Sequence, residues 1–441
     1  MISLGCPKNL VDSEVMLGQL SQHGYEICQD ASEADVILIN TCGFIQSAVE
    51  EGIDAIMEMV LVKEQAPDAL LVVSGCMVQR YGDALRKELP EVDLFVGTES
   101  FHQIVASIEL LRAEKRKSPA LLQLTTRRYL MDSSVARRLS TPPHRAYLKV
   151  TEGCDNRCSY CLIPSIRGKQ RSRPIEDLLR EARHLEAGGV QELTLIAQDL
   201  TAYGTDLGRS GPRLADLLSG LVAETGIPWL RMLYLHPARL DEKVIRMVAD
   251  QRRLTPYFDI PLQHISNSIL KRMRRPYARQ QATDLLARIR DILPTAAIRT
   301  TFMVGFPGET EEDLAQLEEF IASQRFDHLG VFAYSNEEGC DAAKLDGQVD
   351  EGTKQRRQER IMTRQAVVSQ EKNETMIGTQ MEVLIEGLSR ETDLLLEGRT
   401  RRQAPEIDGC VYINEGEGKP GDLVKVRITE AHPYDLVGEI I

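Results

Sequence analysis

Residues 152–173 read EGCDNRCSYCLIPSIRGKQRSR, and this stretch places Cys154, Cys158 and Cys161 within eight residues. Three thiolates so close together in a CxxxCxxC spacing are expected in a loop wrapped around an inorganic centre and not on one rigid strand or helix. Four-iron clusters usually take four thiolates, so a loop with three leaves one iron open to an exchangeable ligand. Two alternatives stay open at this point: a zinc knuckle, which usually adds a second CxxC or a His pair, and a core of reduced cysteines.

The composition is typical of a large soluble globular protein with two or three domains. The chain has 441 residues, 42% of them hydrophobic and 27% charged, and a formal net charge of −13. It contains no apolar run of the roughly eighteen residues that a membrane span needs, and it begins without the basic segment of a signal peptide. Nine cysteines, an odd number, favour reduced thiols or metal ligands over disulfides. We therefore expect a cytoplasmic protein.

Three apolar runs in residues 1–112 each end in a cysteine, at Cys6, Cys42 and Cys76, with amphipathic helical patterns such as 13–23 and 47–62 between them. Such runs predict a doubly wound α/β sheet of parallel strands, whose carboxyl ends share one edge. The three cysteines are expected to meet at that edge, although each one taken alone also fits a small buried core residue. The cysteines outside this pattern are expected to be core residues: Cys28, Cys340 and Cys410.

Strands and helices alternate between residues 140 and 371. Apolar runs predict six strands, at 146–150, 192–197, 230–235, 257–262, 298–304 and 329–334, and helical patterns separate them, at 175–187, 214–224, 240–249, 277–293 and 311–323. Six such units predict a partial (β/α)6 barrel of the TIM kind, with its functional site at the carboxyl ends of the strands. The cysteine loop follows the first predicted strand, which is where chemistry on such a fold belongs.

Residues 374–441 differ in character, because short alternating runs are separated by Gly and Pro turns. They predict a small five-stranded β-barrel related to OB folds. A polar helical pattern at 352–373 connects this barrel to the preceding domain, and the charged stretch 111–139 connects the first two domains. The predicted domains are therefore residues 1–112, 140–371 and 374–441.

The order of these domains resembles the radical S-adenosylmethionine (SAM) methylthiotransferases over essentially the whole chain. Members of that family combine a three-cysteine N-terminal domain, a radical-SAM partial barrel and a C-terminal TRAM barrel. Besides the CxxxCxxC loop, the resemblance rests on SLGCPKNLVDSE (3–14), IAQDLTAYG (196–204), LYLHP (233–237), YFDIPLQH (257–264) and TTFMVGFPGET (300–310). Within the family the chain is most similar to the RimO-type branch, which methylthiolates an aspartate of the small-subunit ribosomal protein numbered twelve.

The resemblance implies two 4Fe–4S clusters and SAM as cofactors. It assigns Cys154, Cys158 and Cys161 to the SAM-binding cluster, and it assigns a second, auxiliary cluster with an open iron to Cys6, Cys42 and Cys76. It also implies that SAM cleavage at the first cluster generates a radical that takes hydrogen from an unactivated carbon, while the auxiliary cluster carries the sulfur.

The resemblance implies less about the residues that contact SAM. The candidates are Tyr160, Gln198, Asp199, Arg171, Arg173 and Gly305. A plain alternative for the Gly305 segment is a turn followed by a helix N-cap. Arg171 and Arg173 fit bidentate binding of a carboxylate and equally fit surface charges. His236 and His264 are expected to orient the carboxyl face of the barrel rather than to act as ligands.

The distribution of charge along the chain favours one class of substrate over another. Residues 1–112 hold six basic and 18 acidic side chains, and residues 374–441 hold seven and 14. Acidic outer domains repel a phosphate backbone and attract a basic protein, which favours the ribosomal protein over the tRNA adenosine of MiaB-type enzymes. An alternative of another class is a non-catalytic iron–sulfur electron-transfer module. The expected partners are the basic ribosomal protein and a reducing donor such as flavodoxin or ferredoxin, with no membrane and no tRNA.

Overall fold

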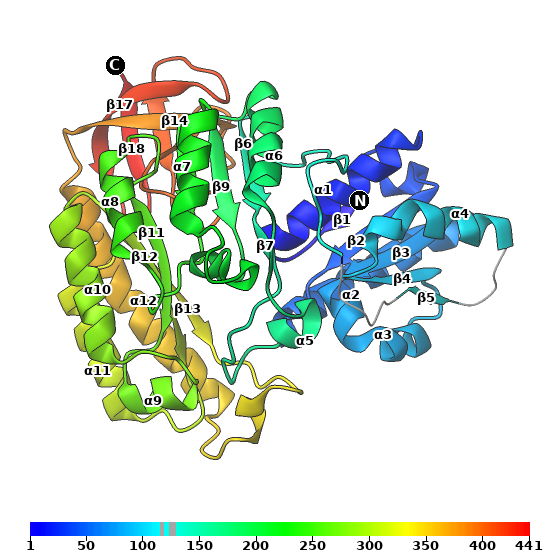
Figure 1. The fold of residues 1–441 in the computed structure, drawn as a ribbon, viewed down its shortest axis with the longest axis horizontal. Helices are drawn as coiled ribbons and strands as arrows, with labels where there is room; N and C mark the ends of the chain where they lie inside the picture. Colours follow the sequence, from blue (N-terminus) through cyan, green and yellow to red (C-terminus); the bar gives the residue numbers. More distant parts are fainter. Residues whose placement is uncertain (115–118, 123–128) are drawn as a thin grey trace.

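The computed structural model describes residues 1–114, 119–122 and 129–441. The chain forms three bodies: an N-terminal α/β domain, a central partial barrel and a C-terminal β-barrel (Figure 1). The N-terminal domain and the C-terminal barrel each contact the central one, on different sides. This arrangement confirms the predicted fold class. Part of the predicted interdomain connection, residues 115–118 and 123–128, lies outside the described residues.

The N-terminal domain is a parallel sheet with helices on both faces. Its strands lie in the order β1 (Ile2–Ser3), β2 (Val36–Thr41), β3 (Leu70–Gly75), β4 (Leu94–Gly97) and β5 (Ala120–Leu122). Helices α1 (Pro7–Gln22) and α4 (Ile104–Glu114) pack on one face, and α2 (Gln46–Gln65) and α3 (Cys76–Glu88) pack on the other. Strand β5 extends this sheet beyond the predicted domain end at residue 112.

Helix α1 begins at Pro7, well before the predicted start at residue 13. Its first turns bury the polar side chains of Lys8, Asn9, Asp12 and Glu14. Buried polar residues do not produce the apolar periodicity from which a helix is predicted, which explains the late predicted start.

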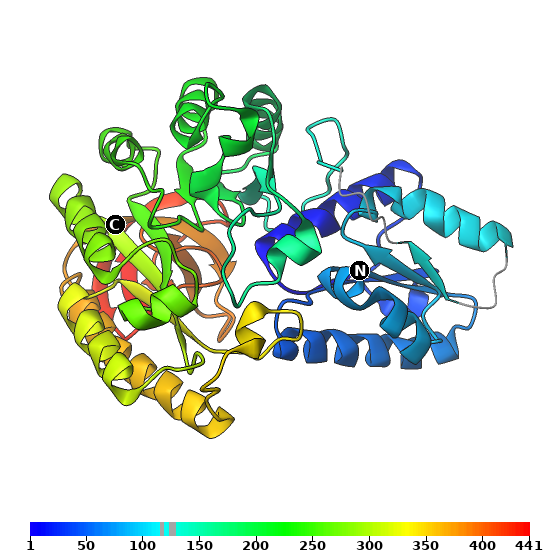
Figure 2. The same cartoon turned by 60° about the horizontal axis from the view of Figure 1, so that its bottom comes forward.

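The central domain is a partial barrel of six parallel strands in two half-sheets. One half-sheet has the order β10 (Trp229–Met232), β9 (Glu192–Ile196), β6 (Arg145–Lys149), and the other has β11 (Tyr257–Gln263), β12 (Ala297–Val304), β13 (His328–Ala333). The covering helices are α6 (Ile175–Ala187), α7 (Leu214–Glu224), α8 (Glu242–Asp250), α10 (Arg279–Ile292) and α11 (Glu311–Gln324), with a short α9 (Asn267–Arg272). All six predicted strands are present. Figure 2 shows the central and N-terminal domains side by side.

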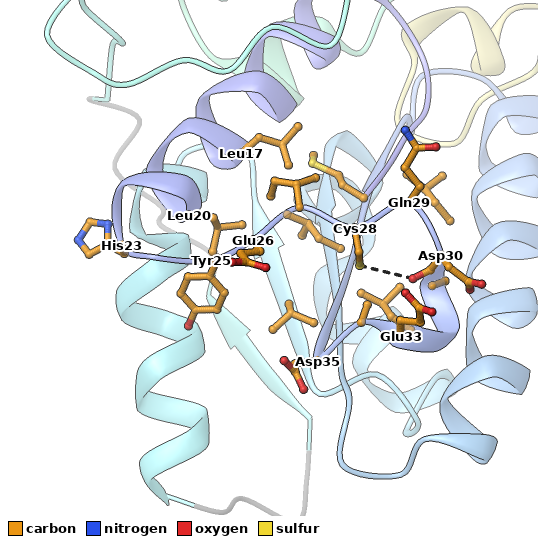
Figure 3. A pocket seen from close by; sticks show the side chains of 18 of the residues that line it. Leu17, Leu20, His23, Tyr25, Glu26, Cys28, Gln29, Asp30, Glu33 and Asp35 are labelled. Atoms are coloured by element: carbon orange, nitrogen blue, oxygen red, sulfur yellow. Dashed lines mark hydrogen bonds between the residues drawn. The ribbon is translucent and has the colours of Figure 1, made fainter.

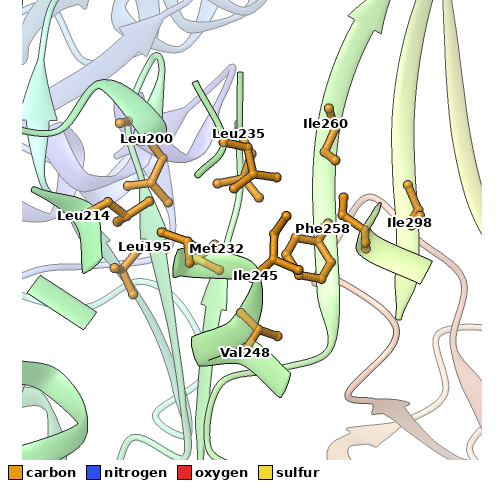
Figure 4. Close-up of a cluster of buried hydrophobic side chains, with 14 of the residues drawn as sticks. Leu195, Leu200, Leu214, Met232, Leu235, Ile245, Val248, Phe258, Ile260 and Ile298 are labelled. Carbon is orange, nitrogen blue, oxygen red and sulfur yellow. The ribbon is translucent and has the colours of Figure 1, made fainter. Parts of the chain in front are cut away.

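The core of the central domain lies between the strands and the covering helices. Figure 4 shows part of it, with Leu195, Met232, Phe258 and Ile298 from four successive strands and Ile245 from α8 in one apolar cluster. These five side chains are all at least 98% buried. Each apolar side chain removed from water in this way contributes about 1.5–3 kcal/mol, so packing between the layers fixes the direction of the strands.

The C-terminal barrel closes the amino end of the central domain. Helix α12 (Glu351–Glu374) leads to β14 (Gln380–Leu388), β15 (Leu396–Thr400), β16 (Val411–Glu415), β17 (Leu423–Ala431) and β18 (Leu436–Ile440), which form the predicted closed five-stranded barrel. The loop after β15 lies across the first residues of the central strands. Asp408 accepts a hydrogen bond from the Tyr257 hydroxyl at 2.6 Å, and Glu406 accepts one from Tyr147 at 3.2 Å.

Among the helices of the described ranges, none combines the length and the apolar character that a membrane span requires.

Candidate functional site

The CxxxCxxC motif lies in a loop without helix or strand, as its spacing predicted. The loop follows β7 (Thr151–Glu152) and ends where α5 (Ile163–Arg167) begins. The Asn156 backbone N–H donates to the Cys154 sulfur at 3.4 Å, and the Arg275 guanidinium lies 3.6 Å from the Cys158 sulfur. Burial raises the pKa of Cys161, and the nearby thiols of Cys158 and Cys154 raise it further. The three sulfur atoms therefore share one environment.

Cys6, Cys42 and Cys76 meet at the carboxyl edge of the N-terminal sheet. Cys6 precedes α1 and Cys76 is the first residue of α3. Gly5 has φ +92°, and a Cβ there would lie 2.8 Å from the Cys42 Cβ, so only glycine permits this approach of the two loops. Burial raises the pKa of Cys76 to about 12, and Cys42 and Cys6 act on it in the same direction while Arg167 opposes them.

Cys6 differs electrostatically from the other two thiols of this triad. Burial alone would raise its pKa. The charges of Lys8 and Arg167, together with the backbone N–H groups of Asn9 and Lys8, hold its pKa below the usual value. A helix amino terminus and nearby cations stabilise a thiolate, which is the form that binds metal.

The donor chemistry of both triads fits iron–sulfur clusters. A 4Fe–4S cluster binds each thiolate through a different iron, so its protein sulfurs stand apart and do not form a site for one ion. In the described part of the chain no group of three His, Cys, Asp or Glu side chains could hold a single metal ion. Three sulfur donors at one loop and three at one sheet edge match the ligands that such clusters take.

The two triads face a common region between the domains. Lys8, two residues after Cys6, lies with its Nζ 3.5 Å from the centre of the Tyr234 ring and 3.4 Å from the Ala197 carbonyl oxygen. Ala197 and Tyr234 follow β9 and β10 at the carboxyl end of the barrel. Cys76 packs with Leu162, immediately after the cysteine loop. The sheet edge that carries one triad is therefore directed at the barrel mouth that carries the other.

Buried ion pairs hold the N-terminal domain in this orientation. Lys149 of β6 contacts Asp12 of α1, and Arg137 bridges Glu14 of α1 and Glu181 of α6 at 2.7 Å each. On the other side, Arg80 of α3 pairs at 2.8 Å with Glu337 in the loop after β13. The polar face of α1 is thus an interdomain surface, a role that its own sequence pattern does not reveal.

The position after β9 carries a polar cluster beside the cysteine loop. Asp199 accepts hydrogen bonds from Asn156 of the loop at 2.9 Å and from Arg239. Burial would raise the pKa of Asp199, but Arg239 and His236 hold it below its usual range. Gln198 is half-buried and lies immediately before Asp199. Asn156 and Arg239, the partners of Asp199, were not among the residues predicted from the sequence, whereas Gln198 and Asp199 were.

Some buried polar atoms around this cluster have no hydrogen-bond partner among the described residues. They are His236 Nε2, Arg239 Nε and Arg275 Nε. Burial is the main reason that the pKa of His236 is lowered to about 3, so its ring is neutral near pH 7. Buried polar atoms without partners are costly, and their presence at the barrel mouth fits a polar ligand such as the amino and carboxylate groups of SAM. His236 and His264 each use Nδ1 to accept a backbone N–H, from Ala238 and Ser266, which agrees with an orienting role.

Tyr160 and Gly305 lie at the same end of the barrel. The Tyr160 ring packs edge-on against Phe306, with ring centres 6.4 Å apart. Gly305 follows β12 with φ +70°, and its N–H donates to Glu309 at 2.7 Å. Thr310 caps α11 as the alternative interpretation of this segment proposed.

Arg171 and Arg173 have protein carboxylates as partners. Arg171 binds Glu99 of the N-terminal domain at 2.8 Å. The Arg173 side chain is only 1% exposed and contacts Asp177 at 2.7 Å and Glu181 at 2.6 Å. The predicted carboxylate binding thus occurs within the chain. Neither residue is therefore part of the proposed SAM site.

The remaining cysteines lie outside both triads. Cys28 is exposed, so the prediction that it is a core residue is wrong. It lines a cavity of about 880 Å³ near Met1, beside Asp30 and Asp35 at the amino end of the sheet (Figure 3). Cys340 is buried as predicted, and Cys410 is half-buried.

Comparison with known proteins agrees with this architecture. Residues 1–97 match the Uncharacterized protein family UPF0004, residues 148–321 match the Radical SAM superfamily, and residues 377–441 match the TRAM domain. The chain is 49% identical to the ribosomal protein uS12 methylthiotransferase RimO of Geobacter sulfurreducens, over 100% of this chain and 98% of the relative. The chain belongs to the RimO family. The RimO of Myxococcus xanthus is 47% identical over 100% of this chain and 91% of its own length.

Solved structures support the fold. The radical SAM methyltransferase TsrM of Kitasatospora setae, with tryptophan and a SAM analogue bound, superposes with a TM-score of 0.56 at 15% identity, over 74% of this chain and 70% of its own. At that identity the likeness concerns the fold alone. Membership of the RimO family implies SAM and two 4Fe–4S clusters as cofactors, which agrees with the two thiol triads.

Proposed function

We propose that the protein is a radical-SAM methylthiotransferase that adds a methylthio group to the β-carbon of an aspartate in ribosomal protein uS12. The observation that carries the proposal is the contact of the sheet edge that carries Cys6 with the barrel mouth, where Lys8 reaches Ala197 and Tyr234. Two sites that act on one substrate carbon must open onto the same space, because covalent chemistry needs reacting atoms within about 3–3.5 Å.

The proposal assigns a separate task to each group of residues. Cys154, Cys158 and Cys161 hold the SAM cluster, and Cys6, Cys42 and Cys76 hold the auxiliary one. When bound, these clusters and SAM supply the radical and sulfur chemistry that protein side chains lack. Asn156, Asp199 and Arg239 form a hydrogen-bonded set that orients SAM, with Gln198, Tyr160 and Gly305 around it. Neutral His236 presents an unpaired nitrogen to the same region.

Charge supports a basic protein as the substrate. Three of the seven basic side chains of residues 374–441, those of Arg399, Arg401 and Arg402, bond to the central domain and are not free for a phosphate backbone. The barrel surface that remains is therefore acidic. Such a surface attracts a basic ribosomal protein and repels tRNA. A small reducing protein such as flavodoxin or ferredoxin is proposed as the electron donor.

The test uses the anaerobic protein with reconstituted clusters, SAM, a reductant and either uS12 or tRNA. We expect uS12 to gain one methylthio group by mass spectrometry and tRNA to remain unchanged. Cys158→Ala should abolish both 5′-deoxyadenosine and product. Cys76→Ala should abolish the product and leave SAM cleavage. Methylthiolation of tRNA but not of uS12 would overturn the choice of substrate. Absence of 5′-deoxyadenosine from the wild-type protein would leave only the non-catalytic alternative.

A further inference from the structure

Arg167 connects the two cysteine sites directly. It is the last residue of α5, shortly after Cys161, and its side chain is 1% exposed. The guanidinium Nη1 lies 2.9 Å from Asp12 in α1 of the N-terminal domain and 3.1 Å from Glu152, which precedes the cysteine loop. One buried guanidinium is thus bound to a helix that follows Cys6 and to the segment that leads into the cysteine loop.

Asn9 extends this connection to the backbone beside two N-terminal cysteines. Its side-chain oxygen accepts a hydrogen bond from Arg167 Nη2 at 3.3 Å. Its side-chain nitrogen donates to the carbonyl of Leu4 at 2.7 Å and to that of Thr41 at 3.4 Å. Leu4 lies two residues before Cys6, and Thr41 lies immediately before Cys42. A displacement of Arg167 is therefore transmitted to the loops that carry both thiols.

The third cysteine of the triad is also in reach of this side chain. The Arg167 charge lowers the pKa of Cys76 against the effect of burial, and it acts in the same direction on the pKa of Cys6 and Cys42. The guanidinium offers five N–H donors in a rigid plane, whereas a lysine offers one flexible point charge. The number of acceptors around Arg167 requires the planar group.

We propose that Arg167 is a positioning residue that fixes the distance and orientation between the Cys6–Cys42–Cys76 triad and the Cys154–Cys158–Cys161 loop. The proposal rests on the proposed function, in which both sites serve one substrate carbon. Arg167 does not touch the substrate in this role. It acts through Asp12, Asn9 and the cysteine loops, so its replacement should separate SAM cleavage from methylthiolation.

The experiment compares the reconstituted full-length wild type with Arg167→Lys, Arg167→Gln and the control Arg137→Gln. Arg137 makes a similar buried interdomain ion pair, with Glu14, but within the described part of the chain its ion-pair partners are the carboxylates Glu14 and Glu181 and not a cysteine. The first readout is the magnetic coupling between the two reduced clusters in pulsed EPR, with iron and sulfide counts. The second is the amount of 5′-deoxyadenosine formed per methylthiolated uS12.

Both Arg167 variants should change the magnetic coupling, and the ratio of 5′-deoxyadenosine to product should rise at least about tenfold, because a misplacement of about 1 Å can cost about a hundredfold in rate. Arg137→Gln, which leaves the other interdomain ion pairs in place, should lower the melting temperature and change both readouts far less than the Arg167 variants do. Loss of auxiliary iron in the Arg167 variants alone would also support the proposal. Unchanged coupling and ratio in both variants, or equal changes in Arg137→Gln, would overturn it. A wild type without activity on uS12 would contradict the proposed function, while the coupling measurement would still decide the role of Arg167.

Discussion

Replacement of Glu192 by glutamine should loosen the attachment of the C-terminal barrel. Glu192 begins β9, and its fully buried carboxylate lies 2.5 Å from Arg231 of β10 and 2.5 Å from Arg399 of β15. Burial would raise the pKa of Glu192, but Arg231 and Arg399 hold it below its usual range. The carboxylate is therefore charged near pH 7 and compensates two buried cations from different domains.

The expected decrease in the free energy of unfolding follows from these contacts. Glu192→Gln keeps the shape and removes the charge, and breaking a buried pair costs about 3–5 kcal/mol. Because Arg399 keeps Glu386 as a second partner, we expect the lower end of that range, about 3 kcal/mol. A domain of 150–250 residues loses about 2–4 °C in melting temperature per kcal/mol, so the decrease should be about 6–12 °C.

The assay combines calorimetry with the fluorescence of Trp229, the single tryptophan of the chain. Its indole N–H donates to Glu382 of the C-terminal barrel at 3.0 Å, so undocking exposes it and shifts its emission to longer wavelength. The control is Glu224→Gln, which removes an exposed ion pair with Arg183 and should cost under about 1 kcal/mol. A Glu192→Gln protein that melts within about 2 °C of the wild type, less than about 1 kcal/mol, would refute this account of the interface.

Three further predictions concern the thiol triad and the pH dependence of stability. Cys76→Ala should retain about half of the iron and sulfide of the reconstituted wild type, since one of two four-iron sites is lost; a full iron count would contradict its assignment as a ligand. Gly5→Ala should cost at least about 1–2 kcal/mol, because φ is +92° and the new Cβ meets Cys42; an unchanged denaturation midpoint would show that the loop adapts. Burial would raise the pKa of Glu386, but His144, Arg399 and Arg145 lower it to about 2 from 4.5. A carboxyl whose pKa is depressed by folding stabilises the protein above its unfolded value, and this stabilisation is lost as the pH falls from about 4.5 to about 2. Glu386→Gln should therefore flatten this acid-side loss in a pH series of denaturation curves, and parallel curves for the two proteins would count against the prediction.

Local patterns predicted most of the fold. The six strands of the central domain and the helices at 175–187 and 214–224 follow from apolar runs and helical periodicity, because those elements bury apolar side chains. The CxxxCxxC loop followed from the spacing of its cysteines. The convergence of Cys6, Cys42 and Cys76 followed from a general property of parallel sheets, in which strand ends share one edge.

Contacts between domains could not be predicted from these local patterns. The start of α1 was missed because Asp12 and Glu14 are buried against Lys149 and Arg137, cations that are far away in the sequence. Arg173 was predicted to contact a ligand because it is charged. Its side chain binds Asp177 instead. Charged residues give the same sequence signal whether they bind a cofactor, another domain or water.

The loop after β15 makes the central domain dependent on the C-terminal barrel, although this barrel lies far from the carboxyl end of the central strands. Where the half-sheets meet, Leu230 forms a bridge with Leu254, and the Leu235 N–H donates to the Asp259 carbonyl at 2.9 Å. At the amino ends of the strands the loop contacts both half-sheets: Glu406 accepts a hydrogen bond from Tyr147 in one, and Asp408 contacts Tyr257 and Arg299 in the other. The loop therefore joins the amino ends of the two half-sheets and limits how far they can move apart. A protein shortened before residue 374 would be expected to lose the geometry of its cofactor site together with its third domain, and exchange of that domain between relatives would require matching changes at the base of the strands.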